Sequence, residues 1–302
     1  TENAQPALMA VSLAVVRVRG SGIAGRAVVV VDESQIEPRI TAWFWGEDWM
    51  TEAFAAGRDV YSENASTLYN RLVDRKKNPA DKIPGFLGKC MTLGLNYGMW
   101  AIMLGVQMQR GMLGGDPVTF DQSFVDAMRV PVDKYLTKYF IDRVDQTPSR
   151  LTGAAKYTHF AVANHVVDTY RGRIKKVVAG WGYLDDVVLP AMANGDEIAF
   201  GVNGVLKTRR HGLVLPDGMT MYYSGLERHV DKRGKVSWTY MKSRAERVFL
   251  HGSKLCENIK QCLANRVTVW HKNRICEFAE ENGLDWPVRG ETHDELIFLP
   301  PA

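Results

Sequence analysis

The apolar positions of the chain fall into runs that differ in kind between its ends and its middle. Near the N-terminus, residues 28–31 are consecutive valines, the composition of a strand buried on both faces, and the run stops at Asp32. Near the C-terminus, the apolar stretches 286–288 and 296–299 flank a short polar segment. This pattern predicts two strands joined by a tight turn.

The middle of the chain shows mainly helical patterns. Residues 48–56 predict a helix that Gly57 ends, and residues 246–281 predict a long amphipathic helix that ends at Asn282. A hairpin is expected over residues 213–221, around a Pro-Asp-Gly turn. The remaining expected elements are helices over 85–100, 123–143 and 159–171 and a strand over 237–240.

Two acidic positions lie where predicted strands end. Asp32 follows the valine run and is held on a rigid element, which suits a metal ligand or a catalytic acid. Alternatively, Asp32 only begins a turn or caps a following helix. His293, Asp294 and Glu295 occupy the predicted C-terminal turn, where acidic residues are usually just solvated. Two strand-end carboxylates are, however, what a two-metal phosphoryl-transfer site requires.

Four segments, in order along the chain, resemble motifs of family A DNA polymerases, the bacterial DNA polymerase I group. Residues 32–39, DESQIEPR, resemble motif A, D-Y-S-Q-I-E-x-R. Residues 89–98, KCMTLGLNYG, are similar to motif B, K-x-x-x-F/Y/L-G-x-x-Y-G. Residues 252–261, GSKLCENIKQ, are similar to the G-G-K-L-x-E-N-x-x-Q segment of phage members, and residues 293–295, HDE, resemble motif C. The resemblance covers residues 28–300.

The resemblance implies an α+β fold, in which an antiparallel palm sheet is built from both ends of the chain and a helical fingers region is inserted. It divides the chain into a first palm part, residues 1–56, a fingers part with an insertion, residues 57–204, and a second palm part, residues 205–302. The implied activity is that of a DNA-directed DNA polymerase. Such an enzyme adds deoxynucleotides from dNTP to the primer 3′ end of primer-template DNA.

The resemblance also implies roles for individual side chains. Asp32 and Asp294 would hold two Mg2+ ions, with Glu295 as an auxiliary carboxylate. Lys89 would neutralise the triphosphate, and Glu37 would exclude a ribose 2′-hydroxyl. Contacts to nucleotide, primer or template are implied for Gln35, Arg39, Leu93, Tyr97 and His293, and contacts to the DNA minor groove for Lys254, Asn258 and Gln261.

The chain departs from the family pattern on the predicted helix over residues 85–100. Lys89, Leu93 and Tyr97 share one face of that helix. The family commonly has an arginine where this chain has Gly85, so one triphosphate contact is missing or comes from another residue, such as Lys82. Leucine at 93 replaces the commoner phenylalanine or tyrosine. Without the other motifs, this face is better explained as that of an amphipathic helix with a snorkelling lysine.

Composition and charge set wide limits. The 302 residues, 46% of them hydrophobic, suffice for one large or two modest domains. Four cysteines without a C-x-x-C pair are typical of ordinary buried thiols in a reducing compartment, so a cytoplasmic location is expected. The apolar residues 7–16 are too few to cross a bilayer, so no membrane partner is expected. A net charge of +4 does not by itself indicate nucleic acid.

Other functions remain open at this point. A single-subunit RNA polymerase shares the palm, and a two-metal nuclease shares acidic pairs, although a nuclease gives no reason for Lys89 and Tyr97 on one helix. A catalytically weak or idle DNA-binding subunit is a further alternative. Family members usually carry a thumb and a 3′–5′ exonuclease before motif A. The sequence is therefore expected to be a fragment or one chain of a split, phage-type polymerase whose thumb and exonuclease are on a separate chain.

Overall fold

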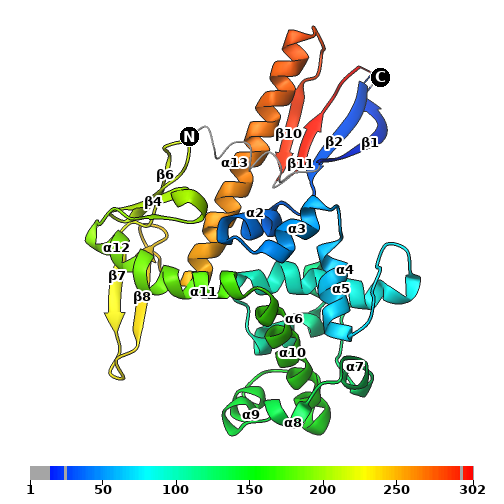
Figure 1. Cartoon of the computed structure of the whole chain (residues 1–302), viewed down its shortest axis with the longest axis vertical. Coiled ribbons are helices and arrows are strands. Elements are labelled where there is room, and N and C mark those ends of the chain that lie inside the picture. The colour runs from blue at the N-terminus through cyan, green and yellow to red at the C-terminus, as the bar shows by residue number, and fades with distance from the viewer. Residues whose placement is uncertain (1–13, 24–25, 293–294, 302) are drawn as a thin grey trace. The chain divides into compact units, whose positions relative to one another are not determined.

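The computed structural model describes residues 14–23, 26–292 and 295–301. The chain forms two compact units (Figure 1). Unit 1 holds the chain up to Thr51 and from Tyr183 onward, and unit 2 is Glu52–Gly182. Helices and antiparallel sheets both occur, which confirms the α+β class. The division into palm and fingers parts rests on the resemblance and stays a prediction.

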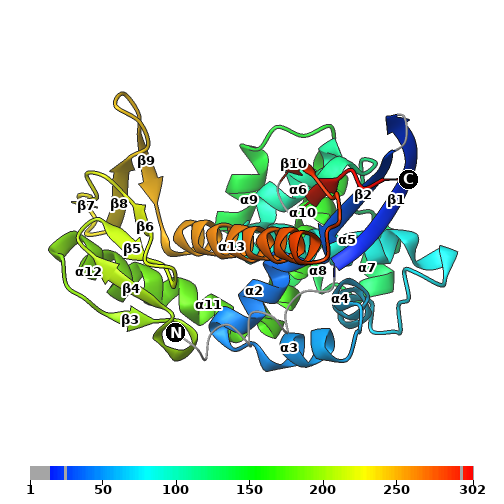
Figure 2. The ribbon, with the colours of Figure 1, turned by 90° about the horizontal axis from the view of Figure 1, so that it is seen from above.

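One sheet of unit 1 is built from both ends of the chain, as expected. Its strand order is β1 (Ala14–Ile23), β2 (Arg26–Glu33), β11 (Glu295–Phe298) and β10 (Val288–Thr292), with antiparallel neighbours throughout. The predicted C-terminal hairpin is thus confirmed. Helix α13 (Gly252–Glu281) runs alongside this sheet (Figures 1 and 2).

The strand β2 is covered less completely than predicted. Val28, Val29 and Val30 are half-buried, and only Val31 is buried among the valines of this strand. Val31 forms a small core with Leu296 and Phe298 of β11, against which Ile275 of α13 packs. The prediction of burial on both faces was wrong, because β-branched composition reports strand propensity and not the number of covered faces.

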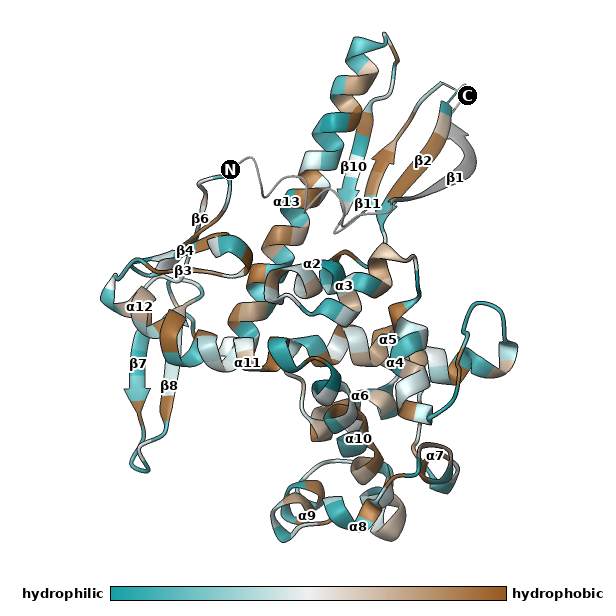
Figure 3. Cartoon of the chain, viewed as in Figure 1, coloured by the Kyte–Doolittle hydropathy of each residue, from teal (hydrophilic) through white to brown (hydrophobic). Residues whose placement is uncertain are grey.

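Hydropathy along the sheet separates its interior from its edge. The strands β2 and β11 are hydrophobic over most of their length, whereas β10 is largely hydrophilic (Figure 3). A polar edge strand is expected, since exposed apolar edges invite pairing with other chains.

The remaining elements of unit 1 lie between β2 and α13 in the sequence. Residues 247–250 pair with β8 as β9, so α13 begins later than the predicted residue 246, while its end at Asn282 is confirmed. The predicted hairpin and the strand over 237–240 are also confirmed. The elements are α2 (Ile36–Trp45), η4 (Leu184–Val188), α12 (Leu189–Asn194), β3 (Ala199–Phe200), η5 (Val202–Gly204), β4 (Leu206–Arg209), β5 (Gly212–Val214), β6 (Thr220–Tyr222), β7 (Glu227–Val230), β8 (Val236–Met241) and β9 (Arg247–Leu250).

Unit 2 is helical in its described residues. The long helix α10 contacts most of its neighbours and buries Phe160, Val166 and Tyr170. No helix in the described part of the chain combines the length and apolar character needed to cross a bilayer. The elements are α4 (Val60–Tyr69), η1 (Pro79–Asp81), α5 (Lys82–Gly94), η2 (Leu95–Tyr97), α6 (Ala101–Arg110), η3 (Met112–Gly114), α7 (Gln122–Met128), α8 (Val132–Tyr135), α9 (Lys138–Asp145) and α10 (Gly153–Arg173), with α3 (Asp48–Ala55) and α11 (Lys175–Tyr183) at the boundaries with unit 1.

The single helix predicted over residues 85–100 was wrong in extent. The helix α5 begins at Lys82, because proline is tolerated in a first helical turn, and it gives way at Leu95 to the 3₁₀ turn η2. Gly98 then adopts a left-handed φ of 75°. Asn96 is buried in this break, where its Oδ1 accepts a hydrogen bond from the Tyr170 hydroxyl at 2.8 Å.

The helix predicted over residues 123–143 is broken into α7, α8 and α9. Arg129 adopts a left-handed φ of 55°, and Pro131 follows before α8 begins. A proline disfavours helical backbone in the residue before it, so the pattern cannot continue as one helix. The helix predicted over residues 159–171 is confirmed as part of the longer α10.

All four cysteines are free thiols. Cys90 and Cys256 are buried, as expected, whereas Cys262 and Cys276 are only half-buried. Burial raises the pKa of the Cys90 thiol to about 12. This thiol is therefore protonated near neutral pH, which fits an ordinary core residue.

His159 in α10 is a buried histidine that must be neutral. Its Nδ1 accepts a hydrogen bond from the Phe120 N–H at 2.9 Å, and its Nε2 donates to the Gly105 carbonyl at 3.0 Å. Burial lowers the pKa of His159, and the bond to Gly105 offsets only part of this effect. Protonation at Nδ1 would remove the acceptor of the Phe120 N–H.

We expect the free energy of unfolding to fall as the pH drops below the ordinary histidine pKa of 6.5. Between that value and the lower pKa of folded His159, the unfolded chain binds a proton that the folded chain does not, so stability is complete above 6.5 and is lost on acidification. Urea unfolding at about pH 7.5 and about pH 5.5 measures this loss. The loss should be smaller in His159→Gln, although burial lowers the pKa of His165 too, with the same sign. Equal losses in both proteins would contradict the assignment.

Candidate active site

Two carboxylates meet on one face of the unit 1 sheet. Asp32 of β2 pairs directly with Glu295 of β11. Directly opposed residues of an antiparallel pair project from the same face, with their Cα atoms about 4.5–5.5 Å apart. The next pair, Val31 and Leu296, projects from the other face into the core. Asp32 and Glu295, both half-buried, therefore share the face opposite that core.

Asp294, the predicted partner of Asp32, lies outside the described residues, as does His293. Glu295 is described. The convergence of Asp32 with Asp294 therefore stays a prediction.

Glu33, next to Asp32, projects toward α13. Its side chain is 1% exposed, and its Oε1 accepts a hydrogen bond from His271 Nδ1 at 2.5 Å. Its Oε2 is buried without a hydrogen-bond partner in the described structure. The Trp270 ring packs edge-on against the His271 ring, with centroids 5.0 Å apart. The hydrogen bond between Glu33 and His271 thus connects the end of β2 to α13, on the sheet face away from Asp32.

We expect His271→Ala to lower the free energy of unfolding by about 3 kcal/mol, since it leaves a buried carboxylate without its hydrogen-bond donor. The matched control is Lys272→Ala on the same helix, which removes the ion pair with Glu291 at 2.6 Å. That pair is more exposed, so its loss should cost less than about 1 kcal/mol. Urea unfolding of both variants measures the difference. Equal losses in the two variants would show that the buried Glu33 contact contributes no more to the free energy of unfolding than the exposed ion pair.

The turn from β2 into α2 has a strained backbone and is stabilised by a buried arginine. Gln35 has φ 57° and ψ 39°, a left-handed conformation that costs a residue with a side chain about 1 kcal/mol. Its Oε1 is buried without a hydrogen-bond partner among the described residues. Arg39, 7% exposed, donates from Nε to the Ser34 carbonyl at 2.8 Å. Burial lowers the pKa of Arg39, and the charge of Glu33 opposes this shift. The predicted substrate contacts of Gln35 and Arg39 stay predictions.

Glu37 lies in the first turn of α2, where the helix dipole favours a negative charge. The helix α2 packs against α13, in which Lys260 is completely buried. Burial lowers the pKa of Lys260, while the charges of Cys256, Glu37 and Glu257 oppose the shift. The side chains of Lys260 and Glu37 thus lie within electrostatic reach of each other.

The three residues of α13 that are predicted to contact DNA lie on one side of the first turns of this helix. Lys254 forms an ion pair with Glu257 at 2.9 Å. Asn258 donates from Nδ2 to the hydroxyl of buried Tyr223 at 3.1 Å, and Gln261 is exposed. The spacing of four and three residues brings these side chains to neighbouring turns of one face.

In unit 2, the helix α5 carries part of the predicted nucleotide-binding face. Lys89 and Leu93 are half-buried on successive turns of α5. Tyr97, also half-buried, lies beyond the end of α5 in η2. Only the first two residues therefore share an α-helical face, because the backbone changes its pitch at Leu95.

Packing against Arg75 explains why position 85 is a glycine in this chain. A Cβ on Gly85 would lie 2.2 Å from the Cβ of Arg75, so any side chain there would displace the segment that carries Arg75. Arg75 binds Asp59 through Nε at 2.7 Å and Nη2 at 3.2 Å, and its guanidinium lies 4.8 Å from the Tyr61 ring centroid. Lys82, the predicted substitute for an arginine at 85, is exposed at the start of α5.

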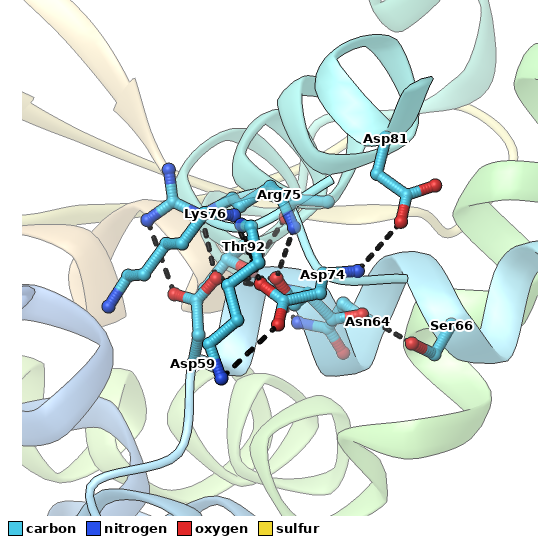
Figure 4. Close-up of polar contacts among 11 residues, drawn as sticks. Asp59, Asn64, Ser66, Asp74, Arg75, Lys76, Asp81 and Thr92 are labelled. Carbon is cyan, nitrogen blue, oxygen red and sulfur yellow. Dashed lines mark hydrogen bonds and ion pairs between the residues drawn. The ribbon is translucent and has the colours of Figure 1, made fainter. Parts of the chain in front are cut away.

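A polar network holds this segment in place (Figure 4). The Asp74 N–H donates to Asp81 Oδ2 at 2.8 Å, and Asn64 of α4 donates to Thr92 of α5 at 2.8 Å. Burial would raise the pKa of Asp59, but hydrogen bonds from Arg75 and Ser62 hold it below its ordinary value. The carboxylate of Asp59 is therefore charged at neutral pH and fixes Arg75.

The donors at the end of β2 fit a hard divalent cation. Asp32 and Glu295 offer carboxylate oxygens, which Mg2+ prefers, and Mg2+ commonly takes only one or two protein carboxylates. Among the described residues, no group of three or more histidine, cysteine, aspartate or glutamate side chains is placed to hold a metal ion.

Sequence patterns missed two features of this site, Lys260 and the pair of Glu33 with His271. Lys260 lies between Ile259 and Gln261 in a mainly polar part of α13, so the local sequence gives no sign of its burial. The Glu33–His271 contact joins residues 238 positions apart, so no local pattern reveals it.

Comparisons with known proteins found similarity to solved structures only. No protein-family model matches the chain, and no curated protein matches it. Among solved structures, the chain is similar to the POL domain of Pol1 from M. smegmatis in complex with DNA primer-template and dNTP, with 18% identity and a TM-score of 0.48. The match covers 92% of this chain and 34% of that chain, so this chain spans about a third of the length of the structure it matches.

Proposed function

We propose that the chain is a DNA-directed DNA polymerase that adds deoxynucleotides to a primer 3′ end. The observation that carries the proposal is the register that sets Asp32 opposite Glu295 on a sheet built from both ends of the chain. The four ordered motifs support it, since their described residues fall on this sheet, on the turn into α2, on α5 and on α13.

In this proposal, unit 1 holds the reacting ends. Asp32 and Asp294 are the ligands of two Mg2+ ions, and Glu295 is the auxiliary carboxylate beside Asp32. When bound, such ions lower the pKa of an attacking hydroxyl and neutralise charge on the leaving pyrophosphate. Glu33, tied to His271, holds the strand that carries Asp32 in its register. His293 positions the primer end.

The remaining side chains select and hold the substrates. Glu37, fixed in the first turn of α2, fills the space of a ribose 2′-hydroxyl. Lys89 of α5 neutralises the triphosphate, and Leu93 packs on base and sugar. The other proposed contacts are Tyr97 to the template base, Arg39 to the substrate, and Gln35, Lys254, Asn258 and Gln261 to the primer-template.

Extension of a labelled primer on a defined template by the purified chain, with Mg2+ and dNTP, tests the proposal. Extension in template order supports it, and a chain that binds primer-template without extending it would instead be an idle DNA-binding subunit. Faster extension with ribonucleotides would indicate an RNA polymerase. Degradation of the primer when nucleotides are absent would indicate a nuclease.

A further inference from the structure

Unit 2 contains an open cavity at the start of α6, beside α8, α9 and α10. Its volume is about 320 Å³. Aromatic and cationic side chains meet there, and none of the described residues that line it is acidic. The residues used below are Trp100, Lys134, Tyr139, Arg143 and Arg171.

Two aromatic rings at this cavity are exposed. Trp100 is 43% exposed and Tyr139 is 66% exposed, so both rings are accessible to a ligand. The guanidinium of Arg143 lies 6.0 Å from the Trp100 ring centroid and 5.5 Å from that of Tyr139. The cavity thus presents flat π-faces next to a planar cation, which suits stacking with planar ligands.

The cavity is also electropositive, and hydrogen bonds to the backbone hold one of its arginines in place. Arg171 donates to the carbonyls of Gly98 and Met99 at 3.3 Å and 3.1 Å, and its Nε is buried without a partner in the described structure. Lys134 lines both this cavity and a second one of about 450 Å³. Asp168, which hydrogen-bonds Tyr135, offsets part of the Arg171 charge but does not line the cavity.

We propose that this cavity binds a single strand of DNA, with bases stacked on Trp100 and Tyr139 and phosphates near Arg143 and Lys134. The combination decides the ligand: an acidic peptide would not use the rings, and a free phosphate needs only the cations. The second cavity at Lys134 favours an extended ligand. The choice of DNA over RNA rests on the proposed function.

Fluorescence anisotropy with a labelled single-stranded dT12 tests this proposal on the whole chain. The measurement is made in EDTA without nucleotides, so it is independent of primer extension. We expect the double variant Trp100→Ala, Tyr139→Ala to bind dT12 roughly tenfold more weakly, and Arg143→Ala to weaken binding and lower its salt dependence by about one ion. The matched control is Arg110→Ala, which removes an exposed arginine of the same unit and should bind like the parent.

Several outcomes would overturn the proposal. One is normal dT12 binding by the aromatic double variant, provided that circular dichroism shows it folded. Another is an equal loss in Arg110→Ala and Arg143→Ala, which would reduce the cavity to part of a general positive surface. Displacement of dT12 by a polyglutamate peptide as readily as by unlabelled dT12 would exclude stacking. Stronger binding of rU12 than of dT12 would overturn the choice of DNA. The two proposals can fail separately: a chain that extends primers could still bind dT12 elsewhere than at this cavity, and a chain that extends no primer could still bind dT12 there.

Discussion

Asp32→Ala is expected to lower the rate of primer extension by roughly a thousandfold or more while leaving the affinity for primer-template largely intact. Asp32 sits at the end of a central strand. In the proposed function it is a metal ligand, so its loss would remove several kcal/mol of transition-state stabilisation. The contribution of Asp32 to holding DNA is small, because a carboxylate repels phosphate. Single-turnover extension and anisotropy with a labelled primer-template measure the two effects separately.

Asp294→Ala should give the same result, because the second metal ligand is equally required. The control is Glu197→Ala, which also removes one negative charge from unit 1. The Glu197 side chain is 71% exposed and forms a surface ion pair with Lys207, so this variant should extend like the parent. Undiminished extension by Asp32→Ala or Asp294→Ala would end the two-metal assignment.

Glu37→Ala is expected to raise the incorporation of ribonucleotides relative to deoxynucleotides by about tenfold or more, which corresponds to about 1.4 kcal/mol of lost discrimination. The physical reason is exclusion: Glu37 lies in the first turn of α2, just after the strained turn at Gln35, and in the proposal its side chain occupies the space of a 2′-hydroxyl. The measurement is the ratio of kcat/KM for matched dNTP and rNTP on one template.

Glu37→Gln separates shape from charge in this prediction. Glutamine keeps the volume of the side chain and removes its charge toward the buried Lys260. A steric role predicts that Glu37→Gln discriminates like the parent, whereas an electrostatic role predicts the same loss as in the alanine variant. Equal discrimination by parent and Glu37→Ala would contradict either role.

Local patterns predicted most elements of the site. The valine run and its stop at Asp32 predicted β2, the polar turn between apolar stretches predicted the hairpin β10–β11, and the long apolar periodicity predicted α13 and its end at Asn282. These features depend on residues close in sequence, so periodicity and turn chemistry suffice to predict them. The α+β class followed from the same patterns together with the motif resemblance.

The tertiary structure decided what the local patterns left open. It set the register that opposes Asp32 to Glu295, the partner of Glu33 on α13, and the burial of Lys260. It also ended α5 at Leu95, where Asn96 bonds to Tyr170, 74 residues away. Sequence by itself determined the strands of the sheet that carries Asp32 and most of α13, because backbone propensity and hydrophobic period are local properties. Which face is buried and which side chains meet were decided only by packing between distant segments, since no local pattern encodes the partner.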